Sequence, residues 1–260
     1  MASFSKSKKQ GRDTILLLMR HGEKEHKSHD EIALLIDRGK RGAYDFGRDL
    51  RSLYPDYRLR RMWSSHIGRT QQTARYLAMG FFGIWNNEMN SGMTIPPFID
   101  EASTAIRIAE NRTLYQTIPP FILDRLWAPE GYLDVSLPAA LEPYNGMNLQ
   151  EHFAIASIPF MEHAIRIHSR RNSDRGNLLV CVSHDFTIES LLYQIVMKES
   201  LRRIWDGKIE AKFLDAIEIR ISGNDLYKNV RFFWKDREFH VQRDKIELLK
   251  AKRRDRNNDS

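Results

Sequence analysis

Residues 14–23 read TILLLMRHGE, an apolar run that ends in a short polar loop containing a glycine. A continuous apolar run such as residues 14–19 is typical of a strand buried inside a parallel sheet. In sheets of that kind, functional sites form beyond the carboxyl ends of the strands. We therefore expect residues 14–19 to form a core strand, and the loop that begins at Arg20 to contribute to a site.

Strands and helices alternate along much of the chain. Apolar and alternating patterns predict strands at 14–19, 58–63, 178–182 and 216–221, and a hairpin at 230–241. Periodic apolar residues predict helices at 37–54, 69–79, 148–171 and 188–196. Strands that alternate with helices indicate a layered core. The expected fold class is an α/β three-layer sandwich with a mostly parallel sheet.

Residues 81–175 differ in composition from the segments on either side of them. Gly, Pro and Asn are frequent there, and Pro-Pro pairs at 96–97 and 119–120 interrupt regular structure. We therefore expect a catalytic α/β core formed by residues 14–80 and 176–242, with residues 81–175 inserted as a partly helical cap.

The formal net charge of +7 is concentrated at the two ends of the 260-residue chain. Residues 1–12 contribute +4 and residues 243–260 contribute +3, from seven basic and four acidic side chains, so residues 13–242 are formally neutral. This distribution favours two solvated basic tails, at 1–13 and 243–260, with contact to an anionic surface as the alternative. We do not expect specific binding of nucleic acid.

Three features of the sequence bear on its location. No apolar run is long enough to span a membrane, and the N-terminal residues lack the apolar segment of a secretory signal. Cys181 is the only cysteine, so no disulfide can form within the chain, which fits a reducing compartment. We expect a cytoplasmic protein without a transmembrane segment, and secretion by a non-classical route stays open.

Polar clusters follow the predicted core strands at equivalent points. They are RHGE at residues 20–23, SSHIGRT at residues 64–70 and SHD at residues 183–185. If the three strands are neighbours in one sheet, these clusters converge on one edge of it.

The residues that would meet there are His21, Asp185, Arg20, Arg69 and His184. Two guanidinium groups suit a dianionic tetrahedral group because their planar forks pair with phosphate oxygens. A neutral imidazole can act as a nucleophile, and nearby positive charge helps to keep it unprotonated. A carboxylic acid can supply the proton that a departing alkoxide needs. Each residue alone has an ordinary structural explanation, such as a helix N-cap for Asp185, so the prediction of a phosphate site depends on their shared position after strands.

Several ordered segments resemble one known family. The segments are LLLMRHGE (16–23), LIDRGKRGAYDFGRDLRSLYP (35–55), WSSHIGRTQQTARYLAMGFF (63–82), SHDFTIESLLYQ (183–194) and FLDAIEIRISGNDLYKNVRFFWKDREFHV (213–241). Together they resemble the histidine phosphatase superfamily, with its RHG motif, and within it the histidine acid phosphatase branch. The resemblance covers 14–80 and 176–242 and does not extend to 81–175.

The resemblance implies a role for each matching residue. It makes His21 the nucleophile that becomes phosphohistidine and Asp185 the proton donor. It makes Arg20, Arg69 and His184 the ligands of the phosphate. It further implies a phosphoglycerate-mutase-like fold. The implied activity is hydrolysis of a small phosphorylated substrate, a phosphomonoester, without a metal or an organic cofactor.

The loop after the glycine departs from the family pattern. Lys24 stands where the family usually has another arginine. A lysine keeps the charge but loses the bidentate fork, so Lys24 is a phosphate-binding candidate whose contribution differs from that of arginine. His26 and His29 lie beside Asp30 and Glu31, but three-residue spacing in a charged loop is weak evidence for a metal, and we expect none.

Two alternatives stay open at this point. A phosphoglycerate-mutase-like phosphotransferase would take its acid from a glutamate after the second arginine, for which Glu101 is the candidate. The His-Asp pair at residues 184–185, in place of His-Gly, argues against that alternative. A non-catalytic protein that binds a phosphorylated ligand is the other.

Overall fold

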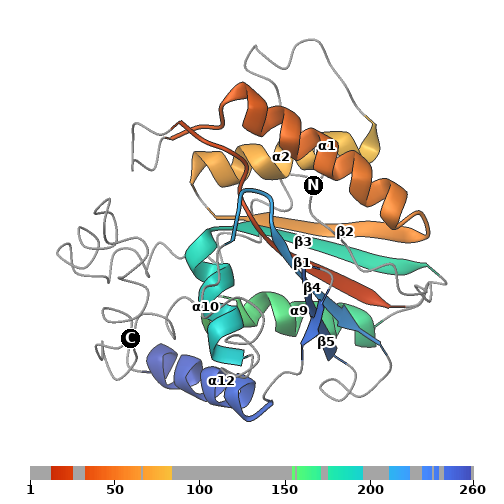
Figure 1. Ribbon diagram of the computed structural model, residues 1–260. Helices are drawn as coiled ribbons and strands as arrows, with labels where there is room; N and C mark the ends of the chain where they lie inside the picture. Colours follow the sequence, from red (N-terminus) through yellow and green to blue (C-terminus); the bar gives the residue numbers. More distant parts are fainter. Residues whose placement is uncertain are drawn as a thin grey trace.

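The computed structural model describes residues 13–25, 33–65, 67–83, 154–155, 157–170, 175–195, 211–222, 230–235, 237–239 and 243–258, which form a sheet with helices on both faces (Figure 1). The strands are β1 (Thr14–Arg20), β2 (Tyr57–Ser64), β3 (Gly176–Ser183), β4 (Ala216–Ile221), β5 (Val230–Trp234) and β6 (Arg237–Phe239). The helices are α1 (Asp37–Leu53), α2 (Gly68–Phe82), α9 (Ile158–Ser169), α10 (Asp185–Ile195) and α12 (Arg243–Asn258).

The sheet is mixed, with the strand order β2-β3-β1-β4-β5-β6. β2, β3 and β1 run parallel, whereas β4, β5 and β6 pair antiparallel with their neighbours. The α/β fold class is therefore confirmed, and the expected parallel arrangement holds for the half of the sheet that ends in the polar clusters. The antiparallel half contains the hairpin predicted within 230–241.

The side chains of β1 alternate between two apolar layers. Leu16 and Leu18 pack in a cluster with residues of α9, α10 and α12. Ile15 and Leu17 pack on the opposite face with residues of α1 and α2. Because β1 and β3 are covered on both faces, their apolar runs are continuous rather than alternating. The predicted three layers are thus helices, sheet and helices, as Figure 1 shows.

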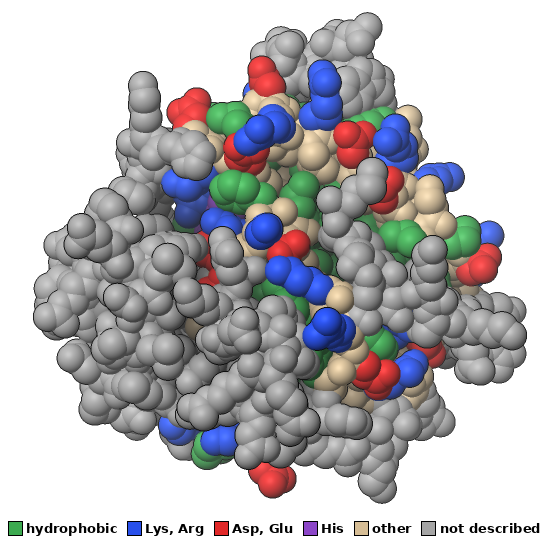
Figure 2. Space-filling view, viewed as in Figure 1, with side chains coloured by type: hydrophobic (Ala, Val, Ile, Leu, Met, Phe, Trp, Pro, Cys, Tyr) green, Lys and Arg blue, Asp and Glu red, His purple; other side chains and the backbone are tan. Residues whose placement is uncertain are grey.

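Glycines allow α1 and α2 to pack with their backbones in close approach. A Cβ atom at Gly47 would lie 2.0 Å from the carbonyl oxygen of Leu77, and one at Gly80 would lie 1.9 Å from that of Tyr44. This close approach fixes α2 against α1, and with it the start of α2, where Arg69 is located. The outer face of α1 carries acidic and basic side chains interspersed, as expected of a solvated helix (Figure 2).

Two predicted segment assignments need correction. α9 falls inside the segment assigned to the cap, but Met161 and Ile165 are buried in the core cluster, so this helix is a layer of the core. Residues 243–258 were expected to be a solvated tail, but they form α12, and Ile246 and Leu249 are buried against the same cluster. The cap residues 84–153, 156 and 171–174 and the N-terminal residues 1–12 lie outside the described residues.

Because α12 packs against the core, two adjacent leucines in it should contribute very differently to the free energy of unfolding. Leu249 is 2% exposed and Leu248 is 45% exposed. We expect Leu249→Ala to lower the free energy of unfolding by about 2–5 kcal/mol, because it removes buried methyl groups and leaves a cavity. The matched control Leu248→Ala should change it by less than about 0.5 kcal/mol. Urea unfolding of both variants measures the difference, and equal values would show that α12 is not part of the core.

Candidate active site

The three polar clusters meet at one edge of the sheet. Arg20, the last residue of β1, pairs with Ser183, the last residue of β3. Ser64, the last residue of β2, pairs with Val182. The carboxyl ends of the parallel strands are therefore level, and α10 begins at the same edge with Asp185. Helix N-termini favour bound anions, and both α2 and α10 begin at this edge.

His21 is buried at this edge, and its hydrogen bonds determine which ring nitrogen carries the hydrogen of the neutral ring. The ring is 3% exposed, and its Nδ1 lies 2.7 Å from the carbonyl oxygen of Gly22. A carbonyl only accepts, so Nδ1 carries the hydrogen and Nε2 carries the lone pair. The guanidinium Nε of Arg69 donates to that Nε2 at 3.1 Å. The contacts of His21 thus select the tautomer whose lone pair faces a cation.

The surroundings of His21 disfavour its protonation. Burial lowers the pKa of His21 from 6.5 to about 3; the positive charges of Arg69 and Arg20 act in the same direction, against the opposing hydrogen bond to Gly22. Asp185 also opposes the shift, but more weakly. His21 is therefore a neutral imidazole at neutral pH.

This pKa predicts an acid-dependent loss of stability. Above pH 6.5 the ring is neutral in both states, but between pH 6.5 and about 3 only the unfolded chain takes up the proton, so stability falls as pH falls. Between pH 7 and pH 5 the wild type should lose about 2 kcal/mol more than His21→Asn, which does not titrate there. Urea unfolding at the two pH values tests this, and equal losses would mean that the folded protein protonates His21 freely.

Arg20 is held by partners on two sides. Its Nη2 lies 2.7 Å from Oδ2 of Asp185, and its Nη1 donates to the carbonyl oxygen of Ala211 at 2.6 Å. The guanidinium also lies over the ring of Phe213, with 4.3 Å between Cζ and the ring centroid. The predicted proton donor and one predicted phosphate ligand are thus paired with each other.

Arg69 and Gly22 are linked through Thr73. The hydroxyl of Thr73 donates to the carbonyl oxygen of Arg69 at 2.7 Å and accepts from the backbone N–H of Gly22 at 2.9 Å. A Cβ atom at Gly22 would lie 3.0 Å from the carbonyl oxygen of Gly39, so a side chain at this position would press on the start of α1. This link fixes the first turn of α2 against the loop that carries His21.

His184 is buried beside His21 and is oriented by a hydroxyl chain. The two rings are 5.5 Å apart in an edge-to-face arrangement. Nε2 of His184 lies 3.0 Å from Oγ of Ser65, which lies 2.8 Å from Oγ1 of Thr70. Since Thr70 has carbonyl acceptors of its own, this chain connects His184 to the backbone at the start of α2.

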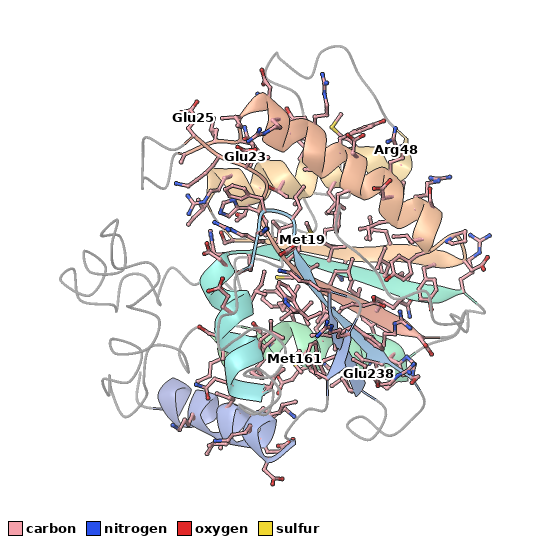
Figure 3. All side chains as sticks on the ribbon, viewed as in Figure 1. Met19, Glu23, Glu25, Arg48, Met161 and Glu238 are labelled. Carbon is pink, nitrogen blue, oxygen red and sulfur yellow. The ribbon has the colours of Figure 1, made fainter. Side chains whose placement is uncertain are left out.

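Lys24 lies in the electrostatic field of the same group. Its backbone pairs with Leu35 just before α1. Figure 3 labels Glu23 and Glu25, its neighbours in the sequence. Burial and the charges of Arg69 and Arg20 lower the pKa of Lys24, whereas Asp185 raises it.

The structure therefore brings together all six predicted site residues: Arg20, His21, Lys24, Arg69, His184 and Asp185. Sequence reasoning missed Phe213 and the positioning hydroxyls of Ser65 and Thr73, although both hydroxyl residues lie in a segment singled out for its arginine. The loop histidines His26 and His29 and the rival acid Glu101 lie outside the described residues.

A family model matches the N-terminal part of the chain. Residues 16–82, about a quarter of the 260 residues, match the model of the histidine phosphatase superfamily (branch 1). The matched segment contains Arg20, His21, Lys24 and Arg69. A comparison with curated protein sequences found no match.

Several solved structures are similar to the chain at low identity. The protein histidine phosphatase SixA complexed with tungstate is 13% identical, with 87% of this chain and 96% of that chain covered and a TM-score of 0.41. A phosphoglycerate mutase from Bacillus anthracis is 15% identical, with coverages of 93% and 98% and a TM-score of 0.44. A mycobacterial glucosyl-3-phosphoglycerate phosphatase is 16% identical, with coverages of 86% and 97% and a TM-score of 0.43. Likeness at this level does not establish a shared activity.

Two features are absent from the part of the chain that the structure describes. Within it, no helix has the length and apolar character needed to cross a membrane. In the same part of the chain, no three His, Cys, Asp or Glu side chains are grouped so that they could hold a metal ion.

Proposed function

We propose that the protein hydrolyses phosphomonoesters through a phosphohistidine at His21. The observation that carries the proposal is the state of the His21 ring, which is neutral, fixed in one tautomer by Gly22, and faces the guanidinium of Arg69 through its Nε2 lone pair. A nucleophile needs an available lone pair, and a phosphoryl group needs cations around it. Both meet at Nε2, whose lone pair accepts from Arg69 in this structure and becomes available when Arg69 donates to the phosphoryl oxygens instead.

The reaction has two steps. Nε2 of His21 attacks phosphorus while the bond to the leaving oxygen breaks, and Asp185 gives that oxygen a proton. Water then attacks the phosphohistidine, its proton passes to Asp185, and the N–P bond breaks to return the lone pair to Nε2. Arg20, Arg69 and His184 hold the phosphoryl oxygens during both steps. The nucleophile, the acid–base group and the phosphate ligands in these steps are all side chains of this protein.

Lys24 is proposed as a further phosphate ligand. It lies in the field of Arg69 and Arg20, and a phosphoryl dianion would offset the repulsion among these cations. As a point charge on a flexible stem, Lys24 adapts to more than one substrate pose, whereas an arginine fork would impose one.

The acid phosphatase type of the activity rests on Asp185. This carboxylate begins α10 directly after His184 and contacts the guanidinium of Arg20. For Asp185 to act as the acid, the phosphoryl group must replace it at Nη2 of Arg20. Substrate binding would therefore release the proton donor at the moment when it is needed.

The test is release of inorganic phosphate from a chromogenic phosphomonoester by the full-length protein, followed by a panel of phosphorylated metabolites. We expect release that is competitively inhibited by tungstate. Transfer of the phosphoryl group to an added phosphorylated acceptor, without net release, would favour the mutase-like alternative. Binding of tungstate with neither release nor transfer would favour the non-catalytic binder.

A further inference from the structure

Residues 211–215, which precede β4, lie directly against the candidate active site. The carbonyl oxygen of Ala211 accepts from Nη1 of Arg20 at 2.6 Å. The ring of Phe213 lies 4.3 Å from the Cζ of Arg20 and has its centroid 5.8 Å from that of the His21 ring. None of these residues was predicted as part of the site.

Both ends of this segment are fixed by hydrogen bonds. The backbone N–H of Ala211 donates to Oε1 of Glu189 on α10 at 2.8 Å. At the other end, the carbonyl oxygen of Asp215 accepts from the backbone N–H of Arg20 at 2.9 Å. The segment is therefore attached to both α10 and β1, the two elements that supply Asp185 and Arg20.

The turn in the middle of the segment has an unusual backbone conformation. Leu214 has a φ of 64°, which is uncommon for a residue other than glycine and costs of order 1 kcal/mol. The backbone N–H of Leu214 points to the carbonyl oxygen of His21 at 3.4 Å, and its side chain packs against buried apolar residues. These contacts hold the turn in the conformation that lays Phe213 over Arg20.

The Nε–Nη2 edge of the Arg20 guanidinium is the edge that can exchange its partner for a ligand. Nη1 is used by Ala211, one face is covered by Phe213, and Nη2 is used by Asp185. Nε is buried and has no hydrogen-bond partner among the described residues. The Nε–Nη2 edge can receive two phosphoryl oxygens side by side, which would satisfy Nε and replace Asp185 at Nη2.

We infer that Phe213 is a positioning residue that holds Arg20 in place while this edge changes partner from Asp185 to the phosphoryl group. The inference rests on the proposed function. When Arg20 loses its ion pair with Asp185, the Ala211 carbonyl and the Phe213 ring are the contacts among the described residues that still hold the guanidinium. A ring also stabilises a cation in a site where water is excluded. Phe213 should therefore contribute to the affinity for a phosphoryl dianion without touching it.

The test compares Phe213→Leu, which keeps an apolar side chain, with Phe213→Tyr, which keeps the aromatic face. Tungstate and inorganic phosphate are the probes, and calorimetry measures their binding without any need for turnover. We expect Phe213→Leu to weaken the binding of both anions by between about two- and thirtyfold, the range of a cation–π contact. Phe213→Tyr should stay within about twofold of the wild type.

Phe233→Leu is a matched control. The ring centroid of Phe233 lies 4.5 Å from the Cζ of Arg220, so the same type of aromatic–arginine contact occurs away from the candidate active site. Arg220 pairs with Ile15, near the start of β1, whereas Arg20 ends that strand. Thermal unfolding is measured for every variant. Phe233→Leu should lower stability and leave anion binding unchanged.

The outcomes separate this inference from the proposed function. Weaker binding in Phe213→Leu, with the tyrosine variant close to wild type, supports the inference. Unchanged binding in Phe213→Leu overturns it and leaves the proposed function standing. Equal losses in the leucine and tyrosine variants, with both folded, also overturn it, because the shape of the ring rather than its aromatic face would then matter. A wild type that neither binds the anions nor releases phosphate rejects the proposed function itself.

Discussion

Replacing His21 with asparagine should lower turnover of a phosphomonoester by at least about 10⁴-fold, the scale of loss seen when a nucleophile is removed. Asparagine retains a donor near the Gly22 carbonyl oxygen, so the loop should keep its conformation. What it lacks is the Nε2 lone pair that faces Arg69. Steady-state phosphate release measures the loss.

A second measurement tests the covalent step directly. Wild-type protein quenched in alkali during turnover of labelled substrate should carry acid-labile phosphate, and His21→Asn should carry none. The matched control is His168→Asn, because His168 is also a buried histidine but bonds to Thr14 at the far end of β1. It should keep both turnover and trapped phosphate. Turnover by His21→Asn near the wild-type rate would remove His21 from the mechanism.

Asp185→Asn should slow the cleavage of an alkyl phosphate by about 10²–10⁴-fold, the usual contribution of a general acid. A nitrophenyl phosphate should be affected far less, because its leaving group departs without a proton. Single-turnover rates for the two substrates give the comparison, since they isolate the first step. The substitution preserves size and the capacity to begin α10.

The rival acid is tested with the same pair of substrates. Glu101→Gln should lower both rates equally or not at all. If Glu101→Gln alone shows the dependence on the leaving group, the acid is Glu101 and the mutase-like alternative gains. An equal loss on both substrates in Asp185→Asn would leave Asp185 as the partner of Arg20 and the start of a helix.

The sequence predicted the parallel half of the fold because β1 and β3 are buried on both faces and therefore read as unbroken apolar runs. It also predicted the edge of the sheet where Arg20 and Asp185 meet, since residues that follow parallel strands converge. Both predictions depend on short stretches of sequence and do not require knowing which side chains contact one another in the folded protein.

Other features depend on tertiary contacts for which the sequence contains no local signal. The three-residue spacing of Ile246 and Leu249 is present in the sequence, but it lies within a run of charged residues that favours a solvated tail. The turn at Leu214 has a positive φ without a glycine to signal it, because tertiary contacts stabilise it. Phe213 could therefore not be placed over Arg20 from its position in the sequence.

The strand order has a consequence for how the protein is made. β3 lies between β1 and β2, yet more than a hundred residues separate it from the end of β2. A nascent chain that has just left the ribosome with β1 and β2 has no adjacent strands to pair, and at about 5–20 residues per second it waits roughly 5–25 s for β3. During that interval the apolar faces of α1 and α2 are uncovered. Synthesis of this protein should therefore depend on chaperones that bind its N-terminal third, and its candidate active site should be complete only after translation has passed residues 211–215.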